Sequence, residues 1–217
     1  MKKERAVTII GGADGPTSVF IASKANNKNI FRYIKNDFLN RRYKKKRRKI
    51  EAGIIAKPHT LQEVVHYITK KYGAVELGIS YHKFECMKKD MKASLVQKKQ
   101  PNLLGTPLEK ISPQNLENEE VIKKWFKKVN EYNEKAINIP DEVFPTDYHL
   151  YEIKQGKTGE LHVEIDFFHE LLRGGYSGDL KVFKKMWKDI YLFYGVSEED
   201  IALKTERYMS LVIVLLH

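Results

Sequence analysis

Residues 148–167 read YHLYEIKQGKTGELHVEIDF, and this stretch decides the fold class. Two runs rich in aliphatic and aromatic residues, 148–153 and 161–167, flank a turn that contains Gly156 and Gly159. Runs of this kind on either side of a glycine-containing turn are typical of a β-hairpin with a long loop. The sequence therefore predicts a small, mainly antiparallel sheet with this hairpin in it.

The second run of the hairpin alternates polar with apolar side chains. Because successive side chains of a strand point to opposite faces, we expect His162, Glu164 and Asp166 to share one face. With His149 or Glu152 opposite, such groups can hold a divalent metal or supply a general base, as in a hydrolase or nuclease. Any one-sided sheet needs the same alternation, however, and no recognised metal-ligand spacing is present. We therefore favour a solvated face, keep the three residues as weak catalytic candidates, and assign no metal ligand or cofactor.

Helical patterns surround the hairpin on both sides in the sequence. Thr60 and Glu63 form a capping-box pattern before an apolar face, and Gly73 follows as a stop. Apolar residues at helical spacing predict the further helices, over residues 29–49, 81–96, 119–132, 180–194 and onward from Ser197.

The predicted fold class is α+β, a helix-rich single domain with five or six helices around the small sheet. The proline-containing stretch 101–116 is a candidate internal boundary between a basic first half and a mildly acidic second half. Residues 174–178 are rich in glycine, and we expect them to form a flexible loop.

The composition fits a folded protein of a reducing compartment. Of the 217 residues, 42% are hydrophobic, which is enough apolar surface to offset the entropy of folding. The apolar runs are shorter than the roughly 18–20 residues that cross a bilayer, and Gly11 to Pro16 interrupts the only candidate signal-peptide core. Cys86 is the single cysteine, so an internal disulfide or a multi-cysteine zinc site cannot form. We expect a soluble, cytoplasmic protein that does not associate with a membrane.

Positive charge is concentrated in the first part of the chain. Residues 1–100 carry 24 lysines and arginines against 8 acidic residues, whereas residues 101–217 carry 15 against 20. Much of the excess comes from eight cations within residues 41–49, namely Arg41, Arg42, Lys44, Lys45, Lys46, Arg47, Arg48 and Lys49.

A helix with this many like charges repels itself, and phosphate groups would relieve the repulsion and release counterions. The run therefore predicts salt-sensitive, sequence-independent binding of nucleic acid or another polyanion. An acidic protein surface is the alternative partner, in which case the protein is a non-catalytic regulator or inhibitor. The sequence leaves the oligomeric state open.

In the N-terminal region, residues 7–10 predict a strand, residues 11–16 a glycine-rich loop and residues 17–23 the beginning of a helix. Such a loop can bring backbone N–H groups to an anion, with the helix dipole adding positive potential. Its candidate anion-binding residues are Gly11, Gly12, Asp14, Gly15, Thr17 and Ser18. A tight turn in which Asp14 accepts local hydrogen bonds is equally compatible with the residues. If the loop instead holds a phosphate near His162, the protein is an enzyme acting on a phosphate-bearing substrate.

The segment GGADGPTS, residues 11–18, resembles a motif of the membrane-embedded β subunit of sodium-translocating decarboxylases. In that family the aspartate of the motif is implicated in sodium coupling, and Asp14 is the matching position. Such a subunit needs many membrane-spanning segments, and because this sequence predicts none, we reject sodium pumping. The whole chain resembles a soluble family that shares this motif and has no assigned activity.

Overall fold

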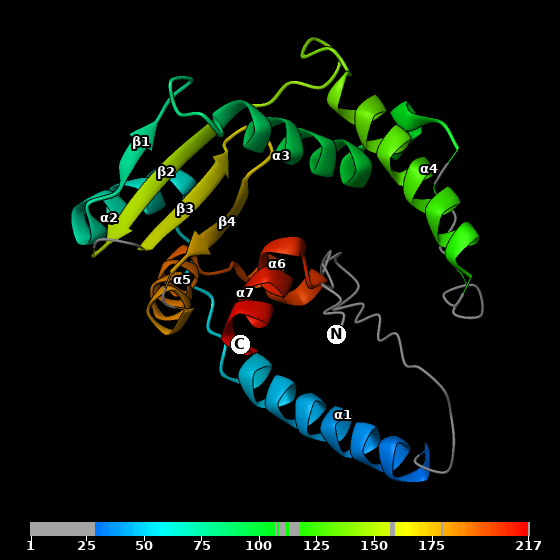
Figure 1. Ribbon diagram of the computed structural model, residues 1–217. Coiled ribbons are helices and arrows are strands. Elements are labelled where there is room, and N and C mark those ends of the chain that lie inside the picture. Colours follow the sequence, from blue (N-terminus) through cyan, green and yellow to red (C-terminus); the bar gives the residue numbers. More distant parts are fainter. Residues whose placement is uncertain are drawn as a thin grey trace. The chain divides into compact units, whose positions relative to one another are not determined.

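The computed structural model describes residues 29–106, 108, 112, 118–156, 159–178 and 180–216. These residues form α-helices and a four-stranded antiparallel sheet (Figure 1), so the predicted helix-rich α+β class is confirmed. The chain divides into two compact units. Within the described ranges, the first unit contains residues 29–58 and 191–216, and the second contains the described part of His59–Ile190. The described part of the 101–116 stretch lies within the second unit.

The sheet of the second unit follows the order of the chain. Its strands are β1 (Val75–Leu77), β2 (Tyr148–Gln155), β3 (Gly159–Asp166) and β4 (Leu171–Ser177), each antiparallel to its neighbour. The hairpin of β2 and β3 lies where the sequence predicts it. The prediction of a flexible loop at 174–178 is wrong, because residues 174–177 belong to β4 and pair with β3. Its composition favours a loop, but the ladder of hydrogen bonds to β3 fixes these residues as an edge strand.

One face of the sheet packs against α3 (Phe84–Lys99). The core on this face contains Phe84, Met91 and Val96 of α3 together with Tyr148 and Leu150 of β2. The 3-10 helix η1 (Pro101–Leu104) and α4 (Glu119–Ile137) complete this layer, since Leu104 and Ala136 are buried in the same core.

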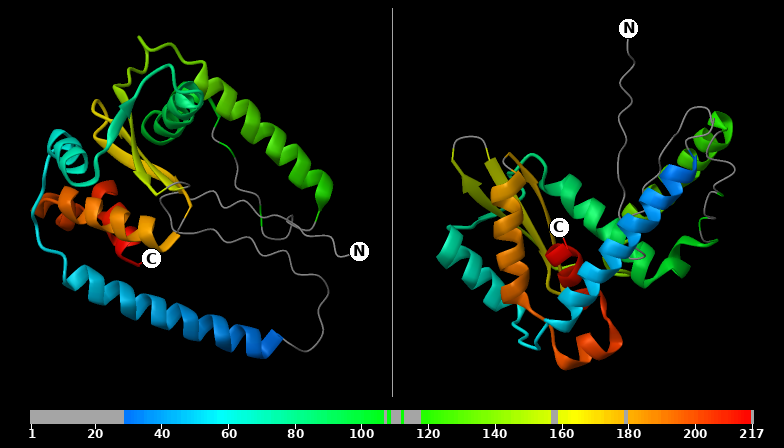
Figure 2. Two further views of the ribbon diagram at one scale, coloured as in Figure 1. Left: turned by 60° about the vertical axis from the view of Figure 1, so that its left-hand side comes forward. Right: turned by 90° about the horizontal axis from the view of Figure 1, so that it is seen from below.

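The opposite face of the sheet packs against α5 (Leu180–Tyr194), and Figure 2 shows α3 and α5 on opposite sides of the strands. Tyr176 of β4 stacks on Phe183 of α5 with ring centroids 5.9 Å apart. Asp189 of α5 accepts hydrogen bonds from three side chains of α2 (Leu61–Tyr72), namely Tyr67, Lys71 and Tyr72. The predicted cap of α2 is confirmed, because Thr60 and Glu63 form both bonds of a capping box and Gly73 ends the helix in the left-handed conformation.

The first unit consists of the helices α1 (Asn29–Ala52), α6 (Glu198–Leu203) and α7 (Glu206–Leu216), together with the end of α5. The sequence predicted five or six helices, whereas the described residues form seven α-helices. One reason is that the last predicted helix is two: Lys204 takes a left-handed conformation with φ 50° and ends α6 before α7 begins. Leu211, Val212 and Leu216 of α7 are buried, as expected for a core segment.

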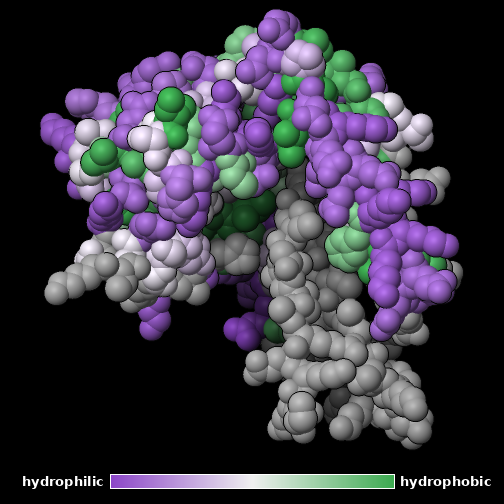
Figure 3. Space-filling model, turned by 45° about the horizontal axis from the view of Figure 1, so that its top comes forward, coloured by the Kyte–Doolittle hydropathy of each residue, from purple (hydrophilic) through white to green (hydrophobic). Residues whose placement is uncertain are grey.

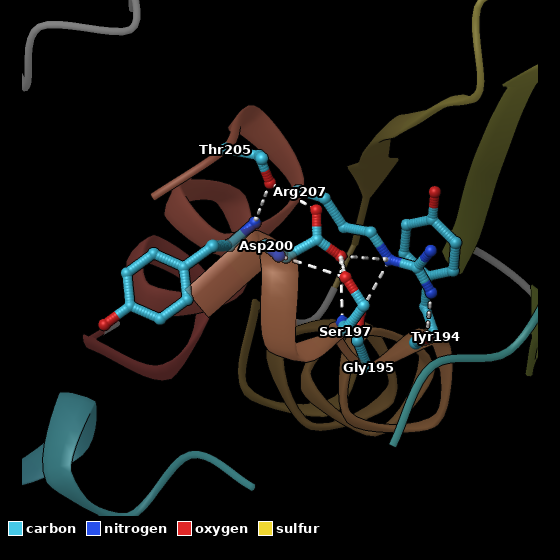
Figure 4. A network of polar contacts seen from close by, with 7 residues as sticks. Tyr194, Gly195, Ser197, Asp200, Thr205 and Arg207 are labelled. Atoms are coloured by element: carbon cyan, nitrogen blue, oxygen red, sulfur yellow. Dashed lines mark hydrogen bonds and ion pairs between the residues drawn. The ribbon is translucent and has the colours of Figure 1, made fainter. Parts of the chain in front are cut away.

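A polar network centred on Asp200 holds α6, α7 and the end of α5 together (Figure 4). The carboxylate accepts bonds from the backbone N–H and hydroxyl of Ser197 at 2.8 and 2.9 Å and from the Thr205 hydroxyl at 2.5 Å. Arg207 lies 3.9 Å from the same carboxylate, donates to the Gly195 carbonyl at 2.8 Å, and covers the Tyr194 ring.

Hydrophilic residues dominate the described surface in the view of Figure 3, with hydrophobic ones in small groups between them. Among the helices of the described ranges, none is both long enough and apolar enough to cross a membrane.

Candidate functional site

The basic run lies in the second half of α1, where the sequence predicted a helix. The helix has 24 residues, which corresponds to a rod about 36 Å long. All eight cations of residues 41–49 are on it, and all but Arg47 are exposed. The structure thus places the predicted nucleic-acid-binding residues on one helix, where seven of the eight side chains are exposed.

One side of α1 contacts α7, and the cations on that side have partners inside the first unit. Lys46 donates its ammonium to the Leu216 carbonyl. The Arg47 guanidinium pairs with Glu51 at 2.7 Å and contacts the sulfur of Met209 at 3.6 Å. These contacts place Arg47 within the packing of α1 against α7, and the hydrogen bond to Glu51 raises the pKa of Arg47.

The other side of α1 carries a basic stripe, which we define as Arg41, Lys44, Lys45 and Arg48. These positions follow the i, i+3, i+4, i+7 spacing, which places four side chains along one face of a helix. On a helix with 3.6 residues per turn, that face points away from the side that contains Lys46 and Arg47. The basic stripe is therefore exposed while the helix remains anchored to α7.

The polar face of β3 is buried, so our interpretation of it as a solvated face is wrong. His162 and Glu164 are each 7% exposed, and Asp166 is 0% exposed. The alternation is real, but α3 and its preceding loop cover this side of the sheet. A sequence pattern of period two reports which side chains share a face, and it does not report what covers that face.

Glu164 belongs to a structural hydrogen-bond network. The Arg173 guanidinium, directly opposite on β4, donates to its carboxylate at 3.0 and 3.2 Å. The Tyr148 hydroxyl donates to the same oxygen at 3.2 Å, and burial next to Glu164 raises the pKa of Tyr148 far above its usual value. The second Arg173 nitrogen also reaches the Met87 carbonyl at 3.4 Å, which links β4 to α3.

Asp166 closes the turn between β3 and β4. Its carboxylate accepts the backbone N–H of His169 at 2.8 Å and that of Asp147 at 3.1 Å. Burial raises the pKa of Asp166, and the two N–H donors partly offset that effect. Both carboxylate oxygens of Asp166 therefore accept backbone hydrogen bonds that stabilise the turn.

His162 is the member of the predicted trio whose neighbours suggest chemistry. It pairs across the hairpin with Glu152, as the sequence allowed, while His149 lies opposite Ile165 on the other face. The structure adds two neighbours that sequence reasoning missed, Tyr81 and Glu160. Glu160 could have been found by extending the alternation two residues towards the turn, whereas Tyr81 comes from a loop 81 positions away and leaves no local signal.

The predicted anion-binding loop, Gly11 to Ser18, lies outside the described residues, and so do Asp14 and the strand predicted at 7–10. The suggestion that this loop meets the β3 face therefore stays a prediction.

Comparisons with known proteins provide no family assignment. No protein-family model, no curated protein and no solved structure matches the chain.

Proposed function

We propose that the protein binds nucleic acid through the basic stripe of α1. The observation that carries this proposal is that the two sides of the helix differ. Lys46 and Arg47 contact α7, whereas the basic stripe is exposed to solvent. Cations at consecutive helical turns match what a polyanion needs, because each phosphate neutralised releases a condensed counterion.

The charge arrangement on α1 also favours a polyanionic partner over an isolated, solvated helix. Like charges at i, i+4 destabilise a helix, and the basic stripe holds two such pairs, Arg41 with Lys45 and Lys44 with Arg48. Glu51, two residues after the run, pairs with Arg47. Bound phosphates would remove the repulsion along the stripe.

The test is fluorescence anisotropy of labelled single-stranded and duplex oligonucleotides at low salt. In one variant, Arg41, Lys44, Lys45 and Arg48 are all changed to Gln. We expect its affinity to fall at least about tenfold, because most of the binding free energy comes from phosphate contacts. Its thermal stability should equal or exceed that of the parent, since like-charge repulsion has been removed.

A matched control changes four exposed lysines of α4 to Gln, namely Lys123, Lys124, Lys127 and Lys128. This control alters the net charge by the same amount at a helix of the other unit. Equal loss in both variants would show that net charge, and not α1, governs binding. If the parent binds no oligonucleotide but captures an acidic protein after nuclease treatment, the protein-partner alternative replaces this proposal.

A further inference from the structure

Three potential metal ligands, none of them part of the basic stripe, meet on one face of the sheet. Glu152 of β2 lies directly opposite His162 of β3, and Lys154 lies opposite Glu160. Directly opposite residues of antiparallel strands project from the same face of the sheet. The hydrogen-bonded ladder therefore fixes Glu152, Glu160 and His162 on one face as neighbours.

The ligand atoms of these three residues are close enough to share one ion. One carboxylate oxygen from each glutamate and one ring nitrogen of His162 all lie within 4.8 Å of one another. His162 Nε2 and the nearer Glu152 oxygen are 3.9 Å apart. Two ligand atoms that are each bound about 2.1 Å from a metal lie roughly 3.0–3.5 Å from each other. Side-chain rotations that move the ligand atoms by about 1–2 Å would therefore complete the site.

Burial makes this arrangement costly without a cation. Glu152 is 9% exposed and His162 is 7% exposed, and a buried carboxylate needs a counter-charge. The Lys154 ammonium lies 3.1 Å from Glu152, but its side chain is 77% exposed, so solvent screens much of the attraction. A second carboxylate, that of Glu160, adds like charge at the same place.

Tyr81 lies at the edge of this cluster. Its hydroxyl lies 3.2 Å from His162 Nε2, and its ring centroid lies 5.6 Å from that of His162. Tyr81 also packs against the buried core on this face of the sheet.

The neighbouring strand leaves room on the same face. Gly175 of β4 lies directly opposite His162, and a Cβ atom built there would meet nothing within 4 Å. An ion next to His162 would have space for water or another oxygen ligand on this side.

We propose that Glu152, Glu160 and His162 bind a divalent first-row transition-metal ion, with Zn²⁺ and Mn²⁺ as the best candidates. Two carboxylates and one imidazole suit these ions, whereas Mg²⁺ prefers an all-oxygen shell with several waters. Three protein ligands leave positions open, as in catalytic metal sites, and a water bound there becomes more acidic.

The test is isothermal titration calorimetry of the chelator-treated protein with Zn²⁺, Mn²⁺ and Mg²⁺ in turn. We expect one site for Zn²⁺ and Mn²⁺, with weaker or no binding of Mg²⁺. Changing Glu152 and Glu160 together to Gln should lower the affinity for Zn²⁺ at least about tenfold, because the remaining imidazole alone binds weakly. The matched control changes Glu134 and Glu142 to Gln, since both are exposed and neither belongs to this cluster.

Metal binding should also stabilise the fold. At a free Zn²⁺ concentration of about 100 times Kd, the melting temperature of the parent should rise by roughly 5–10 °C. Equal affinity in the double variant and in its control, or no binding by the parent, would overturn the proposal.

A second readout needs no variant and so does not depend on whether one folds. X-ray absorption at the zinc edge of the loaded parent should show one imidazole nitrogen among oxygen ligands. A shell with sulfur or with two or more imidazoles would place the ion elsewhere and refute the proposed site.

Discussion

At the scale of single residues, the buried polar side chain of Asp166 on β3 has a structural role. Asp166 is fully buried and its two oxygens satisfy two backbone N–H groups, so its loss leaves both donors unpaired. A buried N–H group without a partner lowers the free energy of unfolding, because its lost hydration is no longer replaced by a hydrogen bond.

We therefore expect Asp166→Ala to lower the free energy of unfolding by about 2–4 kcal/mol. Asp147→Ala is the matched control, since its side chain is 60% exposed and its own N–H remains to be bonded by Asp166. Urea denaturation measures both variants. A loss for Asp166→Ala no larger than for the control would show that the carboxylate does not hold the turn.

Protonation of Asp200 should contribute to the loss of stability of the fold at acid pH. Burial alone would raise its pKa, but the donors Ser197 and Thr205 and the charge of Arg207 lower it overall. A carboxyl whose pKa is lower in the folded state stabilises the fold above its unfolded pKa. That contribution disappears as the pH falls through the folded pKa.

Asp200→Asn should accordingly cost about 2 kcal/mol at pH 7, and the difference from the parent should shrink as the pH falls below 3.8, the ordinary pKa of an aspartate. Glu199→Gln, a neighbouring substitution at an exposed side chain, should leave the profile close to that of the parent. Thermal unfolding followed by circular dichroism across this pH range provides the comparison. A pH-independent difference for Asp200→Asn would contradict the assigned network.

At the scale of the elements, β4 depends on one glycine far more than on its neighbour. A Cβ atom at Gly174 would lie 2.1 Å from the His162 carbonyl oxygen and 2.9 Å from the Trp187 ring, so backbone would have to move. At Gly175 a Cβ atom would meet nothing within 4 Å.

The two alanine substitutions should consequently have opposite signs. Gly174→Ala should lower the free energy of unfolding by about 2–4 kcal/mol through overpacking against backbone. Gly175→Ala should raise it by up to about 1 kcal/mol, because alanine restricts the unfolded chain. Chemical denaturation of both variants under the same conditions measures these changes. Equal changes in the free energy of unfolding would contradict the close approach of β4 to β3 at Gly174.

At the scale of the whole molecule, patterns of short range carried the predictions that succeeded. The capping box of α2 and the hairpin of β2 and β3 follow from local patterns, and both are confirmed. Residues 174–178 were predicted to form a loop because their glycine content favours one. In the structure residues 174–177 belong to β4, and this pairing depends on the partner strand β3, which a local pattern cannot show.

The candidate sites differ in the same way. The basic run of α1 is contiguous, so its residues could be named from the sequence, and only the contact with α7 was needed to select the basic stripe. The Glu152, Glu160 and His162 cluster with Tyr81 depends on strand register and on a distant loop. Sequence reasoning therefore placed Glu152 and His162 opposite each other as an option but could not show that they are buried.

The most direct test of the proposed function is the salt dependence of oligonucleotide affinity. For duplex DNA, the slope of log K against log salt is about −0.9 for each phosphate neutralised. Changing Arg41, Lys44, Lys45 and Arg48 to Gln should therefore make the slope shallower by about 3–4 if all four bind phosphates. The variant with four α4 lysines changed to Gln should keep the parent slope. Identical slopes for the parent and the α1 variant would contradict a nucleic-acid interface on the basic stripe.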